Sequence, residues 1–187
     1  MILIAITGAT GISIAIELLK VLREQKVSTE LIISKAAELV LNNETELNLS
    51  EIYNLATQVY DIDDLEAPPA SGSHKLDAMI VVPCTMKTLA SIAHGYADNL
   101  ITRAADVAIK EQRKLVLVVR ESPLSAIHLE NMLKLAKLGV VIAPPVPSYY
   151  IKPKNVHQLV NHIVGRLLDQ LDFDIGIKRW KDEQMES

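Results

Sequence analysis

Apolar residues form two kinds of block that alternate along the chain. Short continuous runs such as Ile2–Ile6 are typical of strands buried on both faces of a parallel sheet. Between them, apolar residues recur at helical spacing, as Ile14, Leu18 and Leu22 do within Ile12–Gln25. The predicted strands are Ile2–Ile6, Val27–Ile33, Val59–Tyr60, Met79–Val82, Leu115–Val119 and Val140–Ala143. The predicted helices are Ile12–Gln25, one capped by Ser34, a short stretch within Asn42–Thr57, Ala90–Ala93, Leu100–Lys110, Ser125–Leu138 and Val156–Leu171.

This alternation predicts an α/β fold of the Rossmann or flavodoxin-like type: a doubly wound, mostly parallel sheet with helices on both faces. We expect Pro83 to stop the Met79 strand and a loop to occupy Asp61–His74, long enough to be suspected of function. One domain over residues 1–187, with a charged tail from about residue 172, accounts for the whole pattern.

Composition narrows the function classes. The formal net charge of −4 lacks the basic face that nucleic-acid binding requires. No apolar stretch approaches the roughly 20 residues needed to span a bilayer, so we expect no membrane association. The single cysteine, Cys84, cannot form an internal disulfide, which favours a reducing, cytoplasmic location. The mean hydropathy of +0.21 is high for a soluble monomer and favours a homo-oligomer.

Small, polar or turn-forming residues follow the predicted strands. Because ligands bind beyond the carboxyl ends of parallel strands, we expect these segments to converge on one crevice. They are Thr7–Gly11, Ser34, Pro83–Thr88, Arg120–Pro123 and Pro144–Tyr150.

Thr7–Gly11 can present backbone N–H groups and a hydroxyl to an anion at a helix N-terminus. The segment is too short for a dinucleotide fingerprint, so a mononucleotide phosphate fits better than NAD. On this segment alone, a plain tight turn is an equally good interpretation.

Arg120 and Glu121 follow a buried strand, where Arg can hold a phosphate and Glu can move a proton. A surface ion pair of small value is the alternative interpretation. Cys84 is interpreted as a small apolar filler rather than a nucleophile. The five histidines show no metal-ligand spacing, and we expect no metal.

Together these segments resemble the UbiX-type flavin prenyltransferases, within the group of homo-oligomeric flavin-containing decarboxylase-like proteins. The resemblance covers residues from Ile4 to about Trp180. The matching stretches are TGATG (7–11), ISKAAELV (33–40), ASGSH (70–74), VVPCTMKTLASIAHGYADNLITRAADVAIKE (81–111), LVLVVRESPLSAIHLENMLKL (115–135) and PPVPSYY (144–150).

The resemblance implies a metal-independent reaction in which dimethylallyl monophosphate alkylates reduced FMN at N5 and C6. It also implies a UbiD-type decarboxylase as recipient of the prenylated FMN, and a homo-oligomer, which in the family is a dodecamer. The implied residues fall into three sets. The catalytic set is Glu121, Lys110, Arg103 and Glu44; the FMN set is Gly8, Ala9, Thr10, Ser34, Thr85, Met86, Lys87, Thr88 and Arg120; the prenyl phosphate set is Tyr150 and Arg166. In the family, the glutamate matched by Glu44 can reach the active site from a neighbouring subunit.

Two other functions fit the same fold. A flavin-dependent decarboxylase of the cysteine-peptide or phosphopantothenoyl-cysteine type needs a catalytic histidine after an early helix, and no histidine precedes His74. A non-catalytic FMN carrier would not require Glu121, Lys110 and Tyr150 together. Departures from the family pattern at Thr10, Ser122 and His74 leave the choice between prenyl mono- and diphosphate open.

Overall fold

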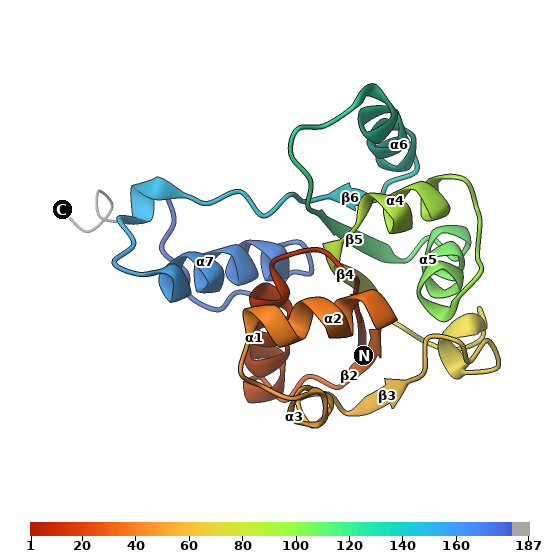
Figure 1. Cartoon of the computed structure of the whole chain (residues 1–187), viewed down its shortest axis with the longest axis horizontal. Helices are drawn as coiled ribbons and strands as arrows, with labels where there is room; N and C mark the ends of the chain where they lie inside the picture. The colour runs from red at the N-terminus through yellow and green to blue at the C-terminus, as the bar shows by residue number, and fades with distance from the viewer. Residues whose placement is uncertain (181–187) are drawn as a thin grey trace.

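Six strands form one parallel sheet in the computed structural model, which describes residues 1–180 (Figure 1). Their order, β3-β2-β1-β4-β5-β6, is that of doubly wound nucleotide-binding folds, and it confirms the predicted fold class. The strands are β1 (Ile2–Ile6), β2 (Thr29–Ile33), β3 (Gln58–Tyr60), β4 (Ala78–Cys84), β5 (Lys114–Val119) and β6 (Val141–Ile142). The helices are α1 (Ile12–Glu24), α2 (Lys35–Glu44), α3 (Leu49–Tyr53), α4 (Met86–Ala93), α5 (Leu100–Lys110), α6 (Ala126–Lys137) and α7 (Val156–Asp169), with 3-10 turns η1 (Pro68–Ala70) and η2 (Tyr149–Ile151).

The sheet divides the buried residues into two cores. Side chains alternate along a strand, so Ile2, Ile4 and Ile6 of β1 face one side while Leu3 and Ala5 face the other. The first core is completed by α1 and α7, and the second by α4 and α5 with part of α6. Both faces are therefore covered, as the continuous apolar runs predict.

Strand order reverses between β1 and β4, which lie side by side at the centre of the sheet. Beyond their paired residues, the buried Thr7 joins the two strands. Its Oγ1 donates to the Pro83 carbonyl at 2.7 Å and accepts from the Thr85 backbone N–H at 2.9 Å. Loops leave this point in opposite directions and open a crevice at the carboxyl edge.

The prediction that Pro83 stops its strand is wrong, because β4 continues to Cys84. The β4–β5 register shifts between Val81 and Cys84, and this irregularity accommodates a residue that has no N–H to donate. Thr85 then caps α4 by accepting from the Thr88 N–H at 3.2 Å.

Several other boundaries also differ. The Asn42–Thr57 stretch divides between the end of α2 and a separate α3 with its own capping box. The helix predicted at Ala90–Ala93 begins at Met86, because a threonine cap rather than apolar periodicity starts it. Strand β2 begins at Thr29 rather than Val27, β6 has two residues, and α7 ends at Asp169 rather than Leu171. Ser34 caps α2 as predicted, accepting from the Ala37 N–H at 3.1 Å.

The predicted loop at 61–74 contains η1 and is tied to the sheet. His74 Nε2 lies 2.8 Å from Oε1 of Glu30, a β2 carboxylate that is only 2% exposed. The Tyr60 hydroxyl donates to the same oxygen at 3.1 Å, and burial raises the pKa of Tyr60 to about 12. This contact fixes the end of the loop against β2.

Residues 170–180, which we call the C-terminal arm, fold back along α7. A Cβ on Gly165 would lie 2.2 Å from Ile177 Cγ2, so the absence of a side chain there lets the arm approach the helix. The arm is the described part of the predicted tail, whose remainder lies outside the described residues.

Over residues 1–180, no helix combines the length and apolar character needed to cross a membrane. The same residues contain no group of three or more His, Cys, Asp or Glu side chains arranged to hold a metal ion.

Burial of Cys84 predicts an unreactive thiol. Burial raises the pKa of Cys84 to about 12, and only the thiolate is nucleophilic. We expect iodoacetamide to modify the native chain at pH 8 at least about a hundredfold more slowly than the urea-unfolded chain, as followed by intact-protein mass spectrometry. Equal rates in the two states would show that the end of β4 is open to solvent.

Candidate functional site

A cavity of about 560 Å³ opens where β1 and β4 diverge. Its volume lies within the usual range for small-molecule and cofactor sites. The endings of β1, β2 and β4 contribute to it, together with the loop after β3 and the start of α5. The lining residues are Thr7, Gly8, Ser34, Lys35, Ala36, Ile62, Asp63, Thr85, Lys87, Thr88, Ser91, Asp98, Asn99, Ile101 and Thr102.

Five of the sequence-predicted FMN residues line this cavity: Gly8, Ser34, Thr85, Lys87 and Thr88. The last three are the cap and first turn of α4. A helix N-terminus with hydroxyls and a lysine beside it is suited to a phosphate. Ser34 Oγ accepts from the Ala37 N–H, which leaves its own hydrogen for a ligand.

Gly8 is required by close packing between the turn after β1 and α2. A Cβ at this position would lie 2.5 Å from Ala36 Cβ and 2.9 Å from the Ala36 carbonyl carbon. Part of this obstruction is backbone, so a larger residue would force the cavity wall to move. Ala9, Thr10 and Met86 belong to the same two segments without lining the cavity.

Sequence reasoning missed an ion pair between two of the lining residues. Lys35 Nζ bonds Asp63 Oδ2, which links the start of α2 to the loop at 61–74. This hydrogen bond raises the pKa of Lys35, whose side chain is exposed. Two features of the sequence could have suggested this ion pair: the position of Lys35 directly after the Ser34 cap, and the length of the loop that contains Asp63. Sequence reasoning also missed Ile62 and Ile101, the apolar residues of the cavity wall. Nothing in the sequence distinguishes them from residues of the core.

An anion does occupy the N-terminus of α1, but it is the carboxylate of Glu44. The Gly11 N–H donates to Oε2 at 2.9 Å and Oε1 at 3.1 Å, and the Ile12 N–H donates to Oε2 at 3.0 Å. The Thr7 hydroxyl is also engaged, with Pro83 and Thr85. Glu44 thus satisfies the Gly11 and Ile12 N–H groups at the start of α1. FMN contacts from Gly8, Ala9 and Thr10, earlier in the turn, stay a prediction, and Gly8 lines the cavity.

Arg120 and Glu121 lie at the same edge of the sheet as the cavity. The Arg120 N–H donates to the Cys84 carbonyl at 3.1 Å, which places the end of β5 beside the end of β4. Both side chains are exposed rather than lining the cavity, and Glu121 accepts from the Ser122 N–H at 2.9 Å.

Arg103 and Lys110 project from α5 toward the 70–74 segment instead. Arg103 Nε donates to the Ala70 carbonyl at 3.0 Å, and its Nη1 bonds Asp106 at 2.6 Å. Lys110 bonds Glu111, and this contact lowers the pKa of Glu111.

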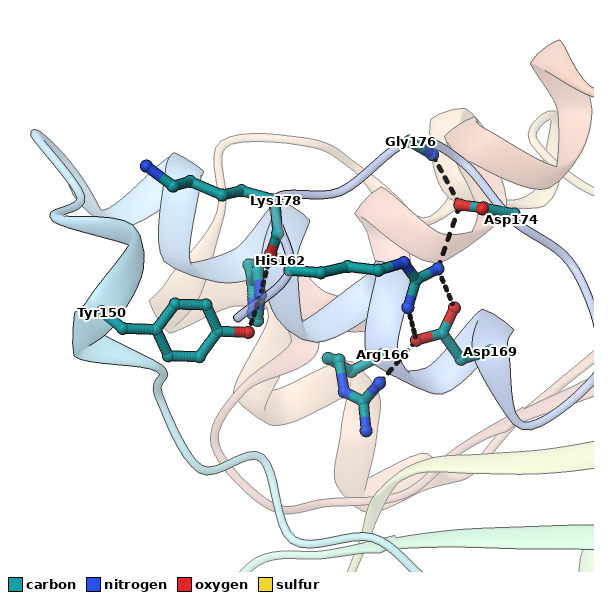
Figure 2. A network of polar contacts seen from close by, with 8 residues as sticks. Tyr150, His162, Arg166, Asp169, Asp174, Gly176 and Lys178 are labelled. Carbon is teal, nitrogen blue, oxygen red and sulfur yellow. Dashed lines mark hydrogen bonds and ion pairs between the residues drawn. The ribbon is translucent and has the colours of Figure 1, made fainter. Parts of the chain in front are cut away.

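Tyr150 belongs to η2 and Arg166 to α7. Helix α7 lies away from β6, at the left of Figure 1. The Tyr150 hydroxyl is 3.1 Å from His162 Nε2, and Arg166 Nη1 donates to Asp169 at 2.7 Å (Figure 2). Neither residue lines the cavity. The prediction that every strand ending meets in one crevice is therefore wrong for a single chain, since the 144–150 segment runs outward from β6 to α7.

The cavity fits a flavin nucleotide. Apolar atoms of Ala36, Ile62 and Ile101 can lie against a planar ring, while the N-terminus of α4 offers N–H groups and hydroxyls to a phosphate. A doubly wound sheet with such a cavity at its switch point defines a mononucleotide-binding α/β protein.

Comparison with known proteins identifies the family. The model of the flavoprotein family matches residues 1–168, and the chain belongs to that family. Within it, the chain is 50% identical over 180 residues to the flavin prenyltransferase UbiX of Methanocaldococcus jannaschii, covering 96% of this chain and 97% of the relative. The chain therefore belongs to the UbiX-type flavin prenyltransferases, as its sequence motifs indicate.

Two solved structures share the fold closely. AnUbiX (PadA1), in complex with FMN and dimethylallyl pyrophosphate, superimposes with a TM-score of 0.95 at 50% identity, covering 96% of each chain. A dodecameric FMN-dependent UbiX-like decarboxylase from Escherichia coli O157:H7 gives 0.94 at 47% identity, covering 97% of this chain and 100% of that one.

The contacts of Glu44 predict a role in stability. We expect Glu44→Gln to lower the free energy of unfolding by about 1 kcal/mol, because the charge at the start of α1 is lost. Urea unfolding at fixed protein concentration measures this. The exposed Glu46 offers a control, and Glu46→Gln should change stability by less than about 0.5 kcal/mol. Equal stability of the two variants would contradict the capping role.

Proposed function

We propose that this protein transfers a dimethylallyl group from a prenyl phosphate to N5 and C6 of reduced FMN, yielding prenylated FMN. The observation that carries the proposal is the switch-point cavity, with its α4 phosphate cradle, in a chain 50% identical to a flavin prenyltransferase over 96% of its length. AnUbiX binds FMN and a dimethylallyl ester together, which supports a shared site for the two substrates.

The chain's own residues account for holding FMN. Thr85 and Thr88 place hydroxyls at the start of α4, where the helix dipole favours a phosphate, and Lys87 adds positive charge. Ser34 donates from the opposite wall. The Lys35–Asp63 pair joins two segments of the lining. Arg120, at the end of β5, can approach the flavin from the exposed side of the cavity.

Prenyl transfer needs stabilisation of a leaving phosphate and movement of protons. As the allylic C–O bond breaks, phosphate takes the electron pair, which Arg and Lys side chains stabilise. The prenyl carbon bonds to flavin N5, which loses its proton. Closing the new ring then requires the remaining prenyl double bond to take up a proton and flavin C6 to lose one. We assign the proton transfer to Glu121 and the phosphate contacts to Arg103, Lys110, Tyr150 and Arg166.

None of these four residues lines the cavity of its own chain, so we infer that they meet at a common site when subunits combine. We propose a homo-oligomer, with a dodecamer favoured by the Escherichia coli relative. Large apolar side chains exposed on one chain support it: Ile127 (69%) and Leu133 (56%) on α6, and Val146 (70%) and Val156 (73%) around the 144–156 segment. The assembly would bring Tyr150 and Arg166 of one subunit to the cavity of another.

Three further expectations belong to the same proposal. Residues 1–187 form one flavoprotein domain that acts in the cytoplasm. Its product is handed to a UbiD-type decarboxylase, which would use prenylated FMN as a cofactor. The prenyl phosphate is the monophosphate, with the diphosphate as the alternative that the AnUbiX complex supports.

An anaerobic assay tests the proposed reaction. Purified protein is incubated with reduced FMN and either dimethylallyl monophosphate or the diphosphate, and the extracted flavin is weighed by mass spectrometry. We expect the flavin mass to rise by one isoprene unit. Bound FMN of unchanged mass with both esters would contradict prenyl transfer and favour a flavin carrier.

Glu121 should act in turnover and not in FMN binding. Its side chain is exposed just after β5, where it accepts from the neighbouring Ser122 N–H. We expect Glu121→Gln to lower kcat by about 10²-fold or more, the usual contribution of a general acid or base, while the Kd for FMN stays within twofold. Glu24→Gln, on the exposed end of α1, serves as the control. Loss of FMN binding in Glu121→Gln would show that Glu121 holds the flavin instead.

A further inference from the structure

The end of α7 carries a charge network that joins Arg166 to the C-terminal arm (Figure 2). Arg179 donates twice to Asp169, from Nη1 to Oδ2 at 3.0 Å and from Nη2 to Oδ1 at 2.9 Å. Arg166 Nη1 donates to the same Oδ2 at 2.7 Å. Arg179 Nη2 also lies 3.2 Å from Asp174 Oδ1. Two guanidinium groups thus share one carboxylate.

The sharing is unequal. Arg179 takes both oxygens of Asp169 in the two-bond geometry that is strongest for this pair of groups. Arg166 bonds the carboxylate through Nη1 alone, and a guanidinium has five N–H donors. The Arg166 side chain is 55% exposed, whereas that of Asp169 is 15% exposed. Most of the Arg166 donor capacity therefore faces away from the network.

Asp169 remains a strong competitor for Arg166 at neutral pH. Hydrogen bonding from Arg179, together with the charges of both arginines, holds the pKa of Asp169 below its ordinary value. The carboxylate is consequently ionised, and any donor removed from it would leave an acceptor that Arg166 can fill.

The arm also orients Tyr150. His162 Nε2 is 3.1 Å from the Lys178 carbonyl and 3.1 Å from the Tyr150 hydroxyl. A carbonyl can only accept, so Nε2 carries the hydrogen and the Tyr150 oxygen accepts from it as well. The hydrogen of Tyr150 is then available to another acceptor. His162 and Arg166 are four residues apart on α7 and share one face of the helix.

We propose that Arg179 is a positioning residue: by occupying both oxygens of Asp169, it keeps the Arg166 guanidinium available to the phosphate of the prenyl substrate. The inference rests on the proposed function, which places that phosphate at Tyr150 and Arg166. Without Arg179, the Asp169 carboxylate takes Arg166 in the two-bond geometry and neutralises it.

Substitution of Arg179 in the full-length, FMN-loaded protein tests the proposal. We expect Arg179→Gln to raise the KM for dimethylallyl monophosphate about fivefold while kcat and the Kd for FMN stay within twofold, as loss of uniform substrate binding predicts. Arg23→Gln is the matched control, because Arg23 lies on α1 and donates to the Asn54 carbonyl at the end of α3, away from the network. Its KM should equal that of the wild type.

A second substitution separates positioning from a structural role. Asp169→Asn in the Arg179→Gln chain removes the competing charge, so the double variant should recover a KM within twofold of the wild type. A packing defect alone would not be repaired by removing another member of the network. A KM unchanged in Arg179→Gln, or a double variant no better than the single one, would overturn the proposal.

Direct binding measurements test the positioning role of Arg179 even if the protein shows no turnover. Calorimetric titration of dimethylallyl monophosphate into each protein loaded with oxidised FMN should show the same order of affinities, with Arg179→Gln about fivefold weaker and the double variant restored. Wild-type binding without flavin prenylation would refute the proposed function but leave this inference to be judged by those affinities. No detectable binding to the wild type would overturn the inference itself.

Discussion

The hydroxyl of Thr7 holds the two central strands together at the point where the cavity opens. It donates to the Pro83 carbonyl at 2.7 Å and accepts from the Thr85 N–H at 2.9 Å, while the Thr7 N–H reaches the same carbonyl at 3.2 Å. These bonds satisfy buried backbone groups where the β1–β4 ladder ends. The start of α4 is thereby fixed relative to the turn after β1, so the flavin cradle is formed before any ligand binds, and less ordering is needed on binding.

Some positions that favour an anion are occupied by carboxylates of the chain itself, and others face the cavity. Glu44 fills the N-terminus of α1, and Asp63 pairs with Lys35 at the cavity. The N-terminus of α4 faces the cavity and is capped by the neutral Thr85. Because a capping carboxylate repels a phosphate, the N-terminus of α4 is a more favourable place for a phosphate than the N-terminus of α1.

Local sequence patterns predict more of the fold than of the candidate site. Continuous apolar runs and helical spacing predict the strands, and the polar residues after β1, β2 and β4 predict where the cavity lies. The extension of β4 through Pro83 escapes such reasoning because a register shift against β5 makes it possible. Lys35–Asp63 and Gly11–Glu44 are contacts between residues 28 and 33 positions apart, which no local pattern reveals. Family motifs name Tyr150 and Arg166, but only the fold shows that they lie away from their own chain's cavity.

That separation gives the C-terminal arm a role in the proposed assembly. Ile177 packs on Gly165, and Arg179 bonds Asp169, so the arm is held against its own α7 by apolar and charged contacts together. Tyr150 and Arg166 are consequently placed on an ordered surface before another subunit arrives. In the proposed homo-oligomer, association would bury exposed apolar side chains such as Val146 and Val156 without having to order the residues that would bind phosphate. Ordering side chains at an interface costs about 0.5–1.5 kcal/mol each, and a preformed arm avoids that cost for the groups on which substrate binding would depend.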